Sequence, residues 1–484
     1  MRREDRLGTV ISGSSFEEVK FVLVPGKRVS PGELVKGRVN DNTFVVCRVR
    51  NCEAISLYDD ARRIHIRDLL GLETEGHVEE GVASFLVATA VPIEELTYDG
   101  KEWICKEVSN LLTPGSSVYK LDPQDIVALL KSPEPRRGIV LGRLYGSNVP
   151  VILDPNEVLP RHVLIVGTTG TGKSYALGVI TEELHKLGIR HVHVDVHGEF
   201  IKTAEELGGE VMVPGKDLTV RLSSLTELEV MGLIPFLTEL QGEIVRRAFL
   251  ELKKEKRAFD VDDLLRKIDE VATWFRAREE TWLNAKARAE LLKHVRIIGR
   301  GTDWLSKLEK PGAFINIDCR DLSHSQLQAL VSALARELLE LLRNDETRRK
   351  LRGIVLSIDE AHLFLPYRRA GEIVPSATVL SEIIRFGRHY GLCLILVTPS
   401  PVDIDRRVVR TTNTRLIFAI EPDQLSAMEG ALADTPREVR NRLMKLRRGV
   451  CLLTGTYETV PHAILVEIRR RRTTHGGETP RLID

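Results

Sequence analysis

Residues 167–174 form a glycine-rich run that ends in a lysine and a serine. The run reads Gly-Thr-Thr-Gly-Thr-Gly-Lys-Ser, follows an apolar segment at 162–166 and precedes an amphipathic stretch. Glycines let the backbone close around phosphate oxygens, so that successive N–H groups and the positive end of a helix dipole face the anion. Lys173 is then placed to reach the β- and γ-phosphates of ATP, and the Ser174 hydroxyl to bind Mg²⁺. The predicted ATP-binding residues are Gly167, Thr168, Thr169, Gly170, Thr171, Gly172, Lys173, Ser174 and Tyr175.

A second apolar run, at 354–358, ends in two adjacent carboxylates, Asp359 and Glu360. Parallel sheets bind ligands at the carboxyl ends of their strands, so this pair would lie beside the phosphates if its strand neighbours the 162–166 strand. Asp359 would then hold Mg²⁺, directly or through water, and Glu360 would polarise the attacking water. The alternative is a strand that merely ends in solvated acids. Together with the phosphate loop, the pair predicts ATP hydrolysis.

Other polar residues follow the ends of predicted strands. Asp195, His197 and Glu199 come at or after the end of a strand predicted at 191–195. They are candidates for a supporting role around Mg²⁺ or the attacking water, and the alternative is capping of the following turn. Two arginines, Arg368 and Arg369, lie in a loop after the acidic strand. They are candidates to line a pore and bind DNA phosphates, although arginines are ordinary in loops.

The composition is that of a soluble globular protein of two or three domains. Of its 484 residues, 43% are hydrophobic and 29% charged, and the net charge is only +1, so contact with DNA depends on local basic patches. No apolar run is as long as a membrane span, and the N-terminus lacks the apolar core of a signal peptide, so we expect no membrane contact and a cytoplasmic protein. Six scattered cysteines favour buried thiols over disulfides or zinc ligands. Few glutamines among many charges fit a thermophile.

The pattern of the chain predicts four regions. Residues 1–112 alternate short β-runs with turns, which predicts a small β-barrel or sandwich with a docking role. Residues 113–138 are typical of a linker with one short helix. Strands and helices alternate over 139–460, which predicts an α/β core around a parallel sheet, interrupted at 223–310 by an α-helical insertion. The basic tail, 461–484, is either a solubilising terminus or a contact for DNA, a neighbouring subunit or a partner. Core strands are predicted at 149–153, 162–166, 191–195, 314–318, 354–358, 392–398, 414–420 and 450–454.

The chain resembles the HerA-type ATPases, the archaeal and bacterial branch of the HerA/FtsK group of hexameric DNA translocases. The resemblance covers nearly the whole chain and rests on the segments 159–162, 167–174, 195–200, 358–362, 384–391 and 469–477. It implies a RecA-like P-loop ATPase core, ATP and Mg²⁺ as cofactors, and a homo-hexamer with double-stranded DNA in its centre. It also implies a NurA-type nuclease docked on the β-barrel, so that the assembly resects DNA ends in double-strand break repair and homologous recombination.

The same resemblance assigns roles to three arginines. Arg388 matches an arginine finger donated across a subunit interface, and Arg161 matches a second arginine close to the nucleotide. Arg385, one helical turn from Arg388, is an alternative for either role. A guanidinium neutralises charge that builds on the γ-phosphoryl group, whereas the alternative for each arginine is a surface salt bridge.

One segment departs from the family pattern. Relatives usually have Ser-Gln-Arg-Pro after the strand that follows the finger helix, and this chain has Thr-Pro-Ser-Pro at 398–401. Proline cannot sense a γ-phosphate as glutamine does, so the hydroxyl of Thr398 is the candidate substitute.

Rival functions share the core chemistry to different degrees. The chain lacks an Asn-Lys-x-Asp sequence for reading guanine, which argues against a GTPase, and a secretion coupling protein would need membrane helices. A ring that remodels proteins and a recombinase-like DNA-binding ATPase both stay open.

Overall fold

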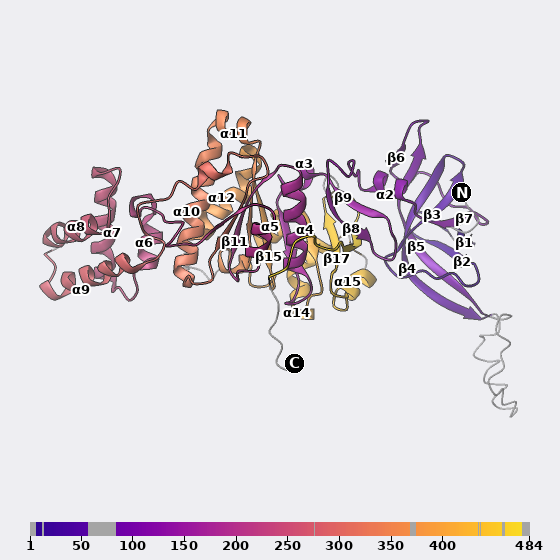
Figure 1. The fold of residues 1–484 in the computed structure, drawn as a ribbon. Coiled ribbons are helices and arrows are strands. Elements are labelled where there is room, and N and C mark those ends of the chain that lie inside the picture. The colour runs from indigo at the N-terminus through magenta and orange to yellow at the C-terminus, as the bar shows by residue number, and fades with distance from the viewer. Residues whose placement is uncertain are drawn as a thin grey trace, which may run out of the picture.

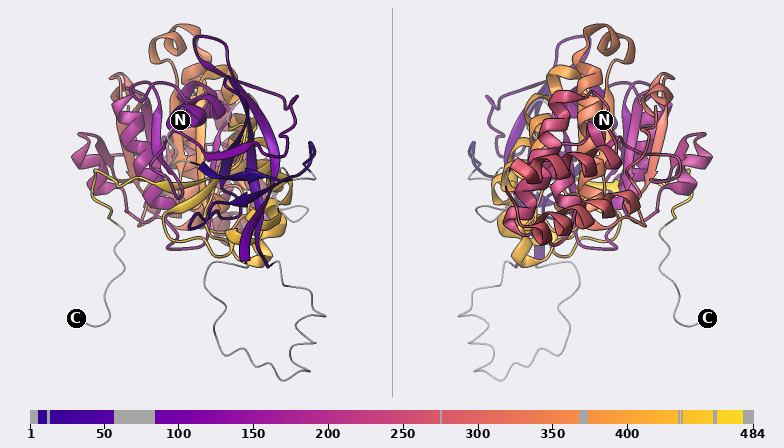
Figure 2. Two further views of the ribbon diagram at one scale, coloured as in Figure 1. Left: turned by 90° about the vertical axis from the view of Figure 1, so that its right-hand side faces the viewer. Right: turned by 90° about the vertical axis from the view of Figure 1, so that its left-hand side faces the viewer.

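The computed structural model describes residues 6–11, 14–56, 84–274, 276–367, 374–433, 435, 437–456 and 460–476. Figure 1 shows an elongated arrangement, with a β-barrel at one end, a large sheet flanked by helices in the middle and a group of helices at the other end. The end-on views of Figure 2 show the barrel in front of the core from one side and the helical group in front of it from the other. In the described part of the chain, no helix is both long and apolar enough to cross a membrane.

Antiparallel strands close into a barrel at the N-terminal end. The strand order is β2-β1-β7-β3-β4-β5, and β5 pairs back to β2, while β6 extends the sheet beyond β5. Closure removes the exposed edges of the paired strands. The strands are β1 (Arg6–Val10), β2 (Val19–Leu23), β3 (Leu34–Asn40), β4 (Thr43–Ser56), β5 (Ser84–Tyr98), β6 (Trp103–Lys106) and β7 (Ser117–Lys120). Strand β7 lies inside the range predicted as a linker, so the barrel continues past residue 112; four residues are too few for alternation to mark a strand.

The core is an 11-stranded mixed sheet with the order β12-β13-β11-β14-β15-β10-β16-β17-β18-β8-β9. Its first seven strands run parallel and the last four are antiparallel. The parallel strands are β12 (Glu210–Met212), β13 (Phe314–Asp318), β11 (Arg190–Asp195), β14 (Ile354–Ile358), β15 (Leu392–Thr398), β10 (Val163–Val166) and β16 (Thr414–Ile417). The antiparallel strands are β17 (Val450–Gly455), β18 (Ile464–Ile468), β8 (Ile139–Leu144) and β9 (Pro150–Leu153). The sheet thus includes β18, within the predicted tail.

The condition attached to the prediction for the acidic pair, that its strand neighbours the 162–166 strand, is not met. Strand β14, which ends in the two carboxylates, does not neighbour β10, which leads into the phosphate loop, because β15 lies between them. The two strands are therefore about 10 Å apart, or two strand spacings. Both nevertheless end at the same edge of the sheet, so their loops open on a common site. The order of these strands in the sheet could not be inferred from the sequence, because β15, which separates β10 from β14, comes after both of them in the chain.

Helices cover both faces of the sheet, because successive strand residues point to opposite sides. Leu164 packs in one core cluster with the helices α10 and α12, and Ile165 packs in the other with α4. The helices that flank the sheet are α3 (Pro155–Val158), α4 (Lys173–Lys186), α5 (Ile201–Glu206), α10 (His324–Arg343), α11 (Asp345–Leu351), α12 (Pro375–Tyr390), α13 (Arg406–Thr411), α14 (Pro422–Leu425) and α15 (Arg437–Leu443). Between β12 and β13 come α6 (Glu227–Leu233), α7 (Glu239–Glu255), α8 (Val261–Trp274) and α9 (Glu279–Glu290), which form the end of the molecule opposite the barrel.

The barrel is attached to the core through helix α2 (Pro123–Leu129). Lys36 of the barrel strand β3 is buried, and its Nζ lies 2.6 Å from Asp125 and 2.9 Å from Asp122, the N-cap of α2. A buried lysine needs such partners because removal of a charge from water is costly. A second junction joins Glu94 of β5 to His462, whose Nε2 lies 3.1 Å from the carboxylate.

Two buried histidines on β11 share one hydroxyl on β14. The Oγ of Ser357 lies 2.6 Å from Nε2 of His191 and 2.7 Å from Nδ1 of His193. Both imidazoles are fully buried, and burial lowers the pKa of His193 from 6.5 to about 3 and that of His191 well below its usual value. The unfolded chain therefore binds protons that the folded chain excludes between pH 6.5 and about 3.

We expect the free energy of unfolding to be independent of this pair above about pH 6.5 and to fall as the pH decreases below it, by up to about 1.4 kcal/mol per pH unit for each histidine. The His193→Gln variant should show a shallower loss between pH 6.5 and 4, measured by urea unfolding at each pH. His389→Gln, at an exposed position of α12, is the matched control and should keep the wild-type slope. Equal slopes in all three proteins would contradict the assignment.

Candidate functional site

The phosphate loop follows β10 and ends at the first turn of α4. Gly167 and Gly172 have φ of 152° and 118°, in the region that favours glycine. A Cβ at Gly167 would also lie 2.5 Å from the Cβ of Phe418. The loop is held from outside the motif, since the N–H of Thr168 donates to the carbonyl of Ala419 at 2.8 Å. The sequence motif gave no sign of this support, because it comes from the segment after β16.

Lys173 bends back over the loop, where its Nζ donates to the carbonyl of Thr168 at 3.1 Å. Burial lowers the pKa of Lys173, and the negative charges of Glu360, Asp359 and Glu199 oppose that shift. The loop and the acidic strand end thus face each other across one site, as the sequence predicted. The strand register adds Thr398, which pairs with Val166 immediately before the loop.

The two carboxylates after β14 have different environments. Asp359 is buried, and burial, with Glu360 and Glu199 nearby, raises its pKa from 3.8 to about 7. Glu360 has φ of 51°, a left-handed conformation that costs a residue other than glycine roughly 1–3 kcal/mol. Backbone strain of this kind is concentrated at functional sites. The turn directs the Glu360 side chain towards His197, whose Nε2 lies 3.2 Å from Oε1.

Asp195 shapes the loop that carries His197. Its Oδ1 accepts from the N–H groups of Gly198 and Glu199 at 2.7 and 3.0 Å, and its Oδ2 accepts from the N–H of Phe200 at 2.9 Å. Asp195 is therefore engaged in capping, one of the two roles that the sequence left open for this segment. His197 instead contacts Glu360, and Glu199 presents a buried Oε2 that has no hydrogen-bond partner among the described residues.

These groups suit a divalent cation. Ligand atoms of His197, Asp359 and Glu360 all lie within 4.8 Å of one another, and carboxylate oxygens are ligands that Mg²⁺ prefers. Ser174 is on the first turn of α4, at the edge of the same site. Crowded acids beside Lys173, with unsatisfied oxygens on Glu199 and Glu360, provide the charge that such an ion would neutralise. The roles of Ser174 and Asp359 in metal binding stay predictions.

The three candidate arginines lie at the other edge of the sheet. Helix α12 runs back from the end of β14 to the start of β15, so Arg385 and Arg388, both exposed, approach the amino end of β15. That strand has seven residues, about 20 Å in length, and only its far end is level with the phosphate loop. Arg161 precedes β10 at the same edge, with Nη2 3.7 Å from Glu157. None of the three reaches the phosphate loop of its own chain.

His162 holds together the edge of the sheet at which these arginines lie. It has φ of 61° and is buried, and its Nδ1 accepts from the N–H of Leu394 at 3.0 Å. Gly387, the residue before Arg388, packs nearby, since a Cβ there would lie 3.4 Å from the imidazole. His162 thereby positions the start of β10 against the end of α12. His162 was not among the site residues predicted from the sequence, although it forms part of the 159–162 segment.

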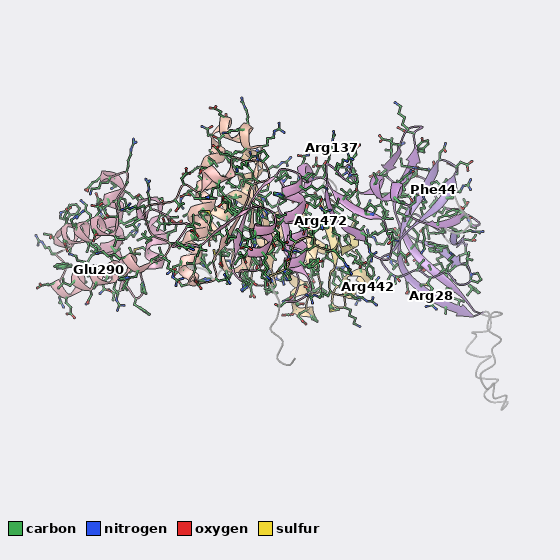
Figure 3. All side chains as sticks on the ribbon, in the orientation of Figure 1. Arg28, Phe44, Arg137, Glu290, Arg442 and Arg472 are labelled. Atoms are coloured by element: carbon green, nitrogen blue, oxygen red, sulfur yellow. The ribbon has the colours of Figure 1, made fainter. Side chains whose placement is uncertain are left out.

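The basic residues after β18 pack on α4. Arg469 lies 2.7 Å from Glu182 and 2.8 Å from Glu183, both buried acids of α4, and Figure 3 shows Arg472 beside the same part of the core. The N–H of Arg471 donates to the hydroxyl of Tyr175 at 2.7 Å. Residues 469–476 are thus a packed arm of the ATPase core, which neither reading of the tail anticipated. The adjacent acids Glu182 and Glu183 of α4 were the feature of the sequence that could have indicated this contact.

Arg368 and Arg369, the predicted DNA contacts, lie outside the described residues. Their role stays a prediction.

The chain is similar to known proteins in sequence and in fold. Residues 139–338 match the family model described as "Helicase HerA, central domain". The chain is 24% identical to the DNA double-strand break repair helicase HerA of Pyrococcus furiosus, over 99% of this chain and 96% of that protein. Among solved structures, it is similar to VirB4 of Thermoanaerobacter pseudethanolicus, with a TM-score of 0.55 and 17% identity over 70% of this chain and 99% of that one.

A second similar structure was solved as a complex with a nucleotide. The plasmid coupling protein TrwB, in complex with ADP and Mg²⁺, has a TM-score of 0.51 and 16% identity over 71% of this chain and 92% of that one. At this identity the likeness concerns the fold, which is the P-loop ATPase core predicted from the sequence. With the phosphate loop and the acidic strand end, these matches identify the chain as an ATP-hydrolysing P-loop enzyme whose residues 139–338 match a HerA central domain.

Proposed function

We propose that this protein is an ATP-dependent double-stranded DNA translocase or helicase, that it works as a homo-hexamer, and that it acts with a NurA-type nuclease to resect DNA ends in double-strand break repair. The observation that carries the proposal is the separation of the phosphate loop and the candidate finger arginines onto opposite edges of one sheet. Such a chain completes a site only when its arginine edge faces the phosphate loop of another copy. Repetition of one such contact closes a ring.

Different residues of the chain have different roles in hydrolysis. The loop N–H groups and Lys173 bind the phosphates, and Glu360 orients the attacking water, with its carboxylate held by His197. Arg388 of a neighbouring copy neutralises charge on the γ-phosphoryl group. Ser174 and Asp359 would hold Mg²⁺, which when bound offsets phosphate charge. Because the site needs two copies, hydrolysis responds to how neighbouring copies move.

The DNA part of the proposal rests on relatives that are named as DNA double-strand break repair helicases. We expect linear duplex DNA to stimulate ATP hydrolysis several-fold, and the stimulation to weaken as salt rises, because phosphate contacts release counterions. The measurement is the steady-state ATPase rate with linear duplex, with single-stranded DNA and with an unfolded protein substrate. Stimulation by the protein substrate alone would favour a remodelling ring, and stimulation by single strands alone would favour a recombinase-like ATPase.

A further inference from the structure

The carboxylate of Glu360 is approached by two imidazoles, one at each oxygen. His197 approaches Oε1 at 3.2 Å, and His362 approaches Oε2 with its Nδ1 at 3.3 Å. His362 is on the short 3-10 turn η5 (Ala361–Leu363), which begins directly after the strained backbone of Glu360. Among the described residues, no donor meets Oε2 with hydrogen-bond geometry, so the contact with His362 is electrostatic.

His362 also reaches the neighbouring strand. Its Nδ1 lies 3.4 Å from Oγ1 of Thr398, the last residue of β15, which is fully buried. That hydroxyl donates to the carbonyl of Ser400 at 3.2 Å and accepts from the N–H of Ser400 at 3.2 Å. With its only proton directed to that carbonyl, the hydroxyl acts as an acceptor towards His362. In the matching tautomer the imidazole carries its proton on Nδ1, which lies near both the hydroxyl and the carboxylate.

This arrangement gives Glu360 a link to the strand that borders the phosphate loop. Thr398 pairs with Val166, the residue before the loop, and β15 lies between β10 and β14. A shift at the end of β15 therefore changes the distance between the Thr398 hydroxyl and the Nδ1–H of His362. Because the same N–H also faces the carboxylate of Glu360, the shift changes how strongly that carboxylate is held. Orientation of a catalytic base is sensitive to such changes, because misplacement of about 1 Å costs on the order of 100-fold in rate.

We propose that His362 is a positioning residue that couples Glu360 to Thr398 through its Nδ1–H, so that the carboxylate is aligned only when the end of β15 is in place. The inference rests on the proposed role of Glu360 in orienting water. His362 does not touch the nucleotide in this scheme. Its contribution is to the turnover rate, and the affinity for ATP does not depend on it.

The test compares two amide substitutions that place a donor at different positions. In His362→Asn the side-chain NH₂ takes the place of Nδ1, whereas in His362→Gln it takes the place of Nε2. We expect the Asn variant to keep kcat within about threefold of wild type, and the Gln and Ala variants to lose about 10- to 100-fold in kcat with KM for ATP unchanged. Thr398→Val should lower kcat in the same way, Thr398→Ser should restore it, and the His362→Ala/Thr398→Val double variant should be no worse than either single one.

Thermal unfolding and binding of a fluorescent ATP analogue confirm that each variant is folded. If His362→Ala does not fold, the Asn and Gln pair still decides the question. Equal loss in the Asn and Gln variants, wild-type kcat in all His362 variants, or additive effects of His362→Ala and Thr398→Val would each overturn the inference. Failure of the proposed function is a separate result, because it would appear as wild-type hydrolysis by Glu360→Gln.

Discussion

Replacement of Glu360 by glutamine should lower ATP hydrolysis by at least about 100-fold while ATP binding persists, because a base that orients water contributes 10²–10⁴-fold to such reactions. The amide keeps the size of the side chain and its contact with His197, so the change removes charge without opening a cavity. Lys173→Ala should abolish hydrolysis by a different route, through loss of a phosphate contact. Single-turnover rates and equilibrium binding of ATP separate the two effects.

Glu346→Gln is the matched control for the carboxylate. Glu346 is exposed on the first turn of α11, away from the phosphate loop, and its amide variant should hydrolyse ATP at the wild-type rate. Wild-type hydrolysis by Glu360→Gln would refute the assignment of Glu360, and loss of ATP binding in that variant would make it a phosphate-binding residue instead.

Mixing Arg388→Ala subunits with Lys173→Ala subunits should restore part of the activity that each lacks alone. An arginine finger is worth about 10³–10⁵-fold in rate, so either homogeneous protein should be nearly inactive. In a mixed assembly, some interfaces pair an intact phosphate loop with an intact Arg388. The reason to expect complementation is geometric, since Arg388 lies at the edge of the sheet opposite the loop of its own chain.

The controls identify which arginine acts. Lys173→Ala mixed with the Lys173→Ala/Arg388→Ala double variant should stay inactive, because no interface then has an intact loop. The same experiment with Arg385→Ala distinguishes the neighbouring arginine of α12. Absence of recovery at any ratio, with mixed assemblies shown to form, would mean that Arg388 does not act between subunits.

The catalytic core was largely predictable because its signals are local. A phosphate loop must carry its glycines, lysine and hydroxyl on consecutive residues, and an acidic strand end places both carboxylates on adjacent positions. Apolar runs likewise marked β13, β14 and β15 with their observed limits. Strands β7 and β12 were missed because four and three residues are too few to show a pattern. Strands β8 and β18 were missed because Arg143 and Glu467 interrupt their apolar runs.

The sequence by itself determined the class of this protein, since the phosphate loop, the acidic strand and their apolar flanks fix a nucleotide-hydrolysing parallel sheet. Only the tertiary structure decided the partners of these residues. It placed β15 between β10 and β14, brought His197 and His362 to the two carboxylate oxygens of Glu360, and packed residues 469–476 on α4. The physical reason is that such contacts join residues far apart in the chain or depend on one backbone angle, such as the φ of Glu360. The residue types near each position do not specify these contacts, because the contacts depend on the packing of the whole sheet.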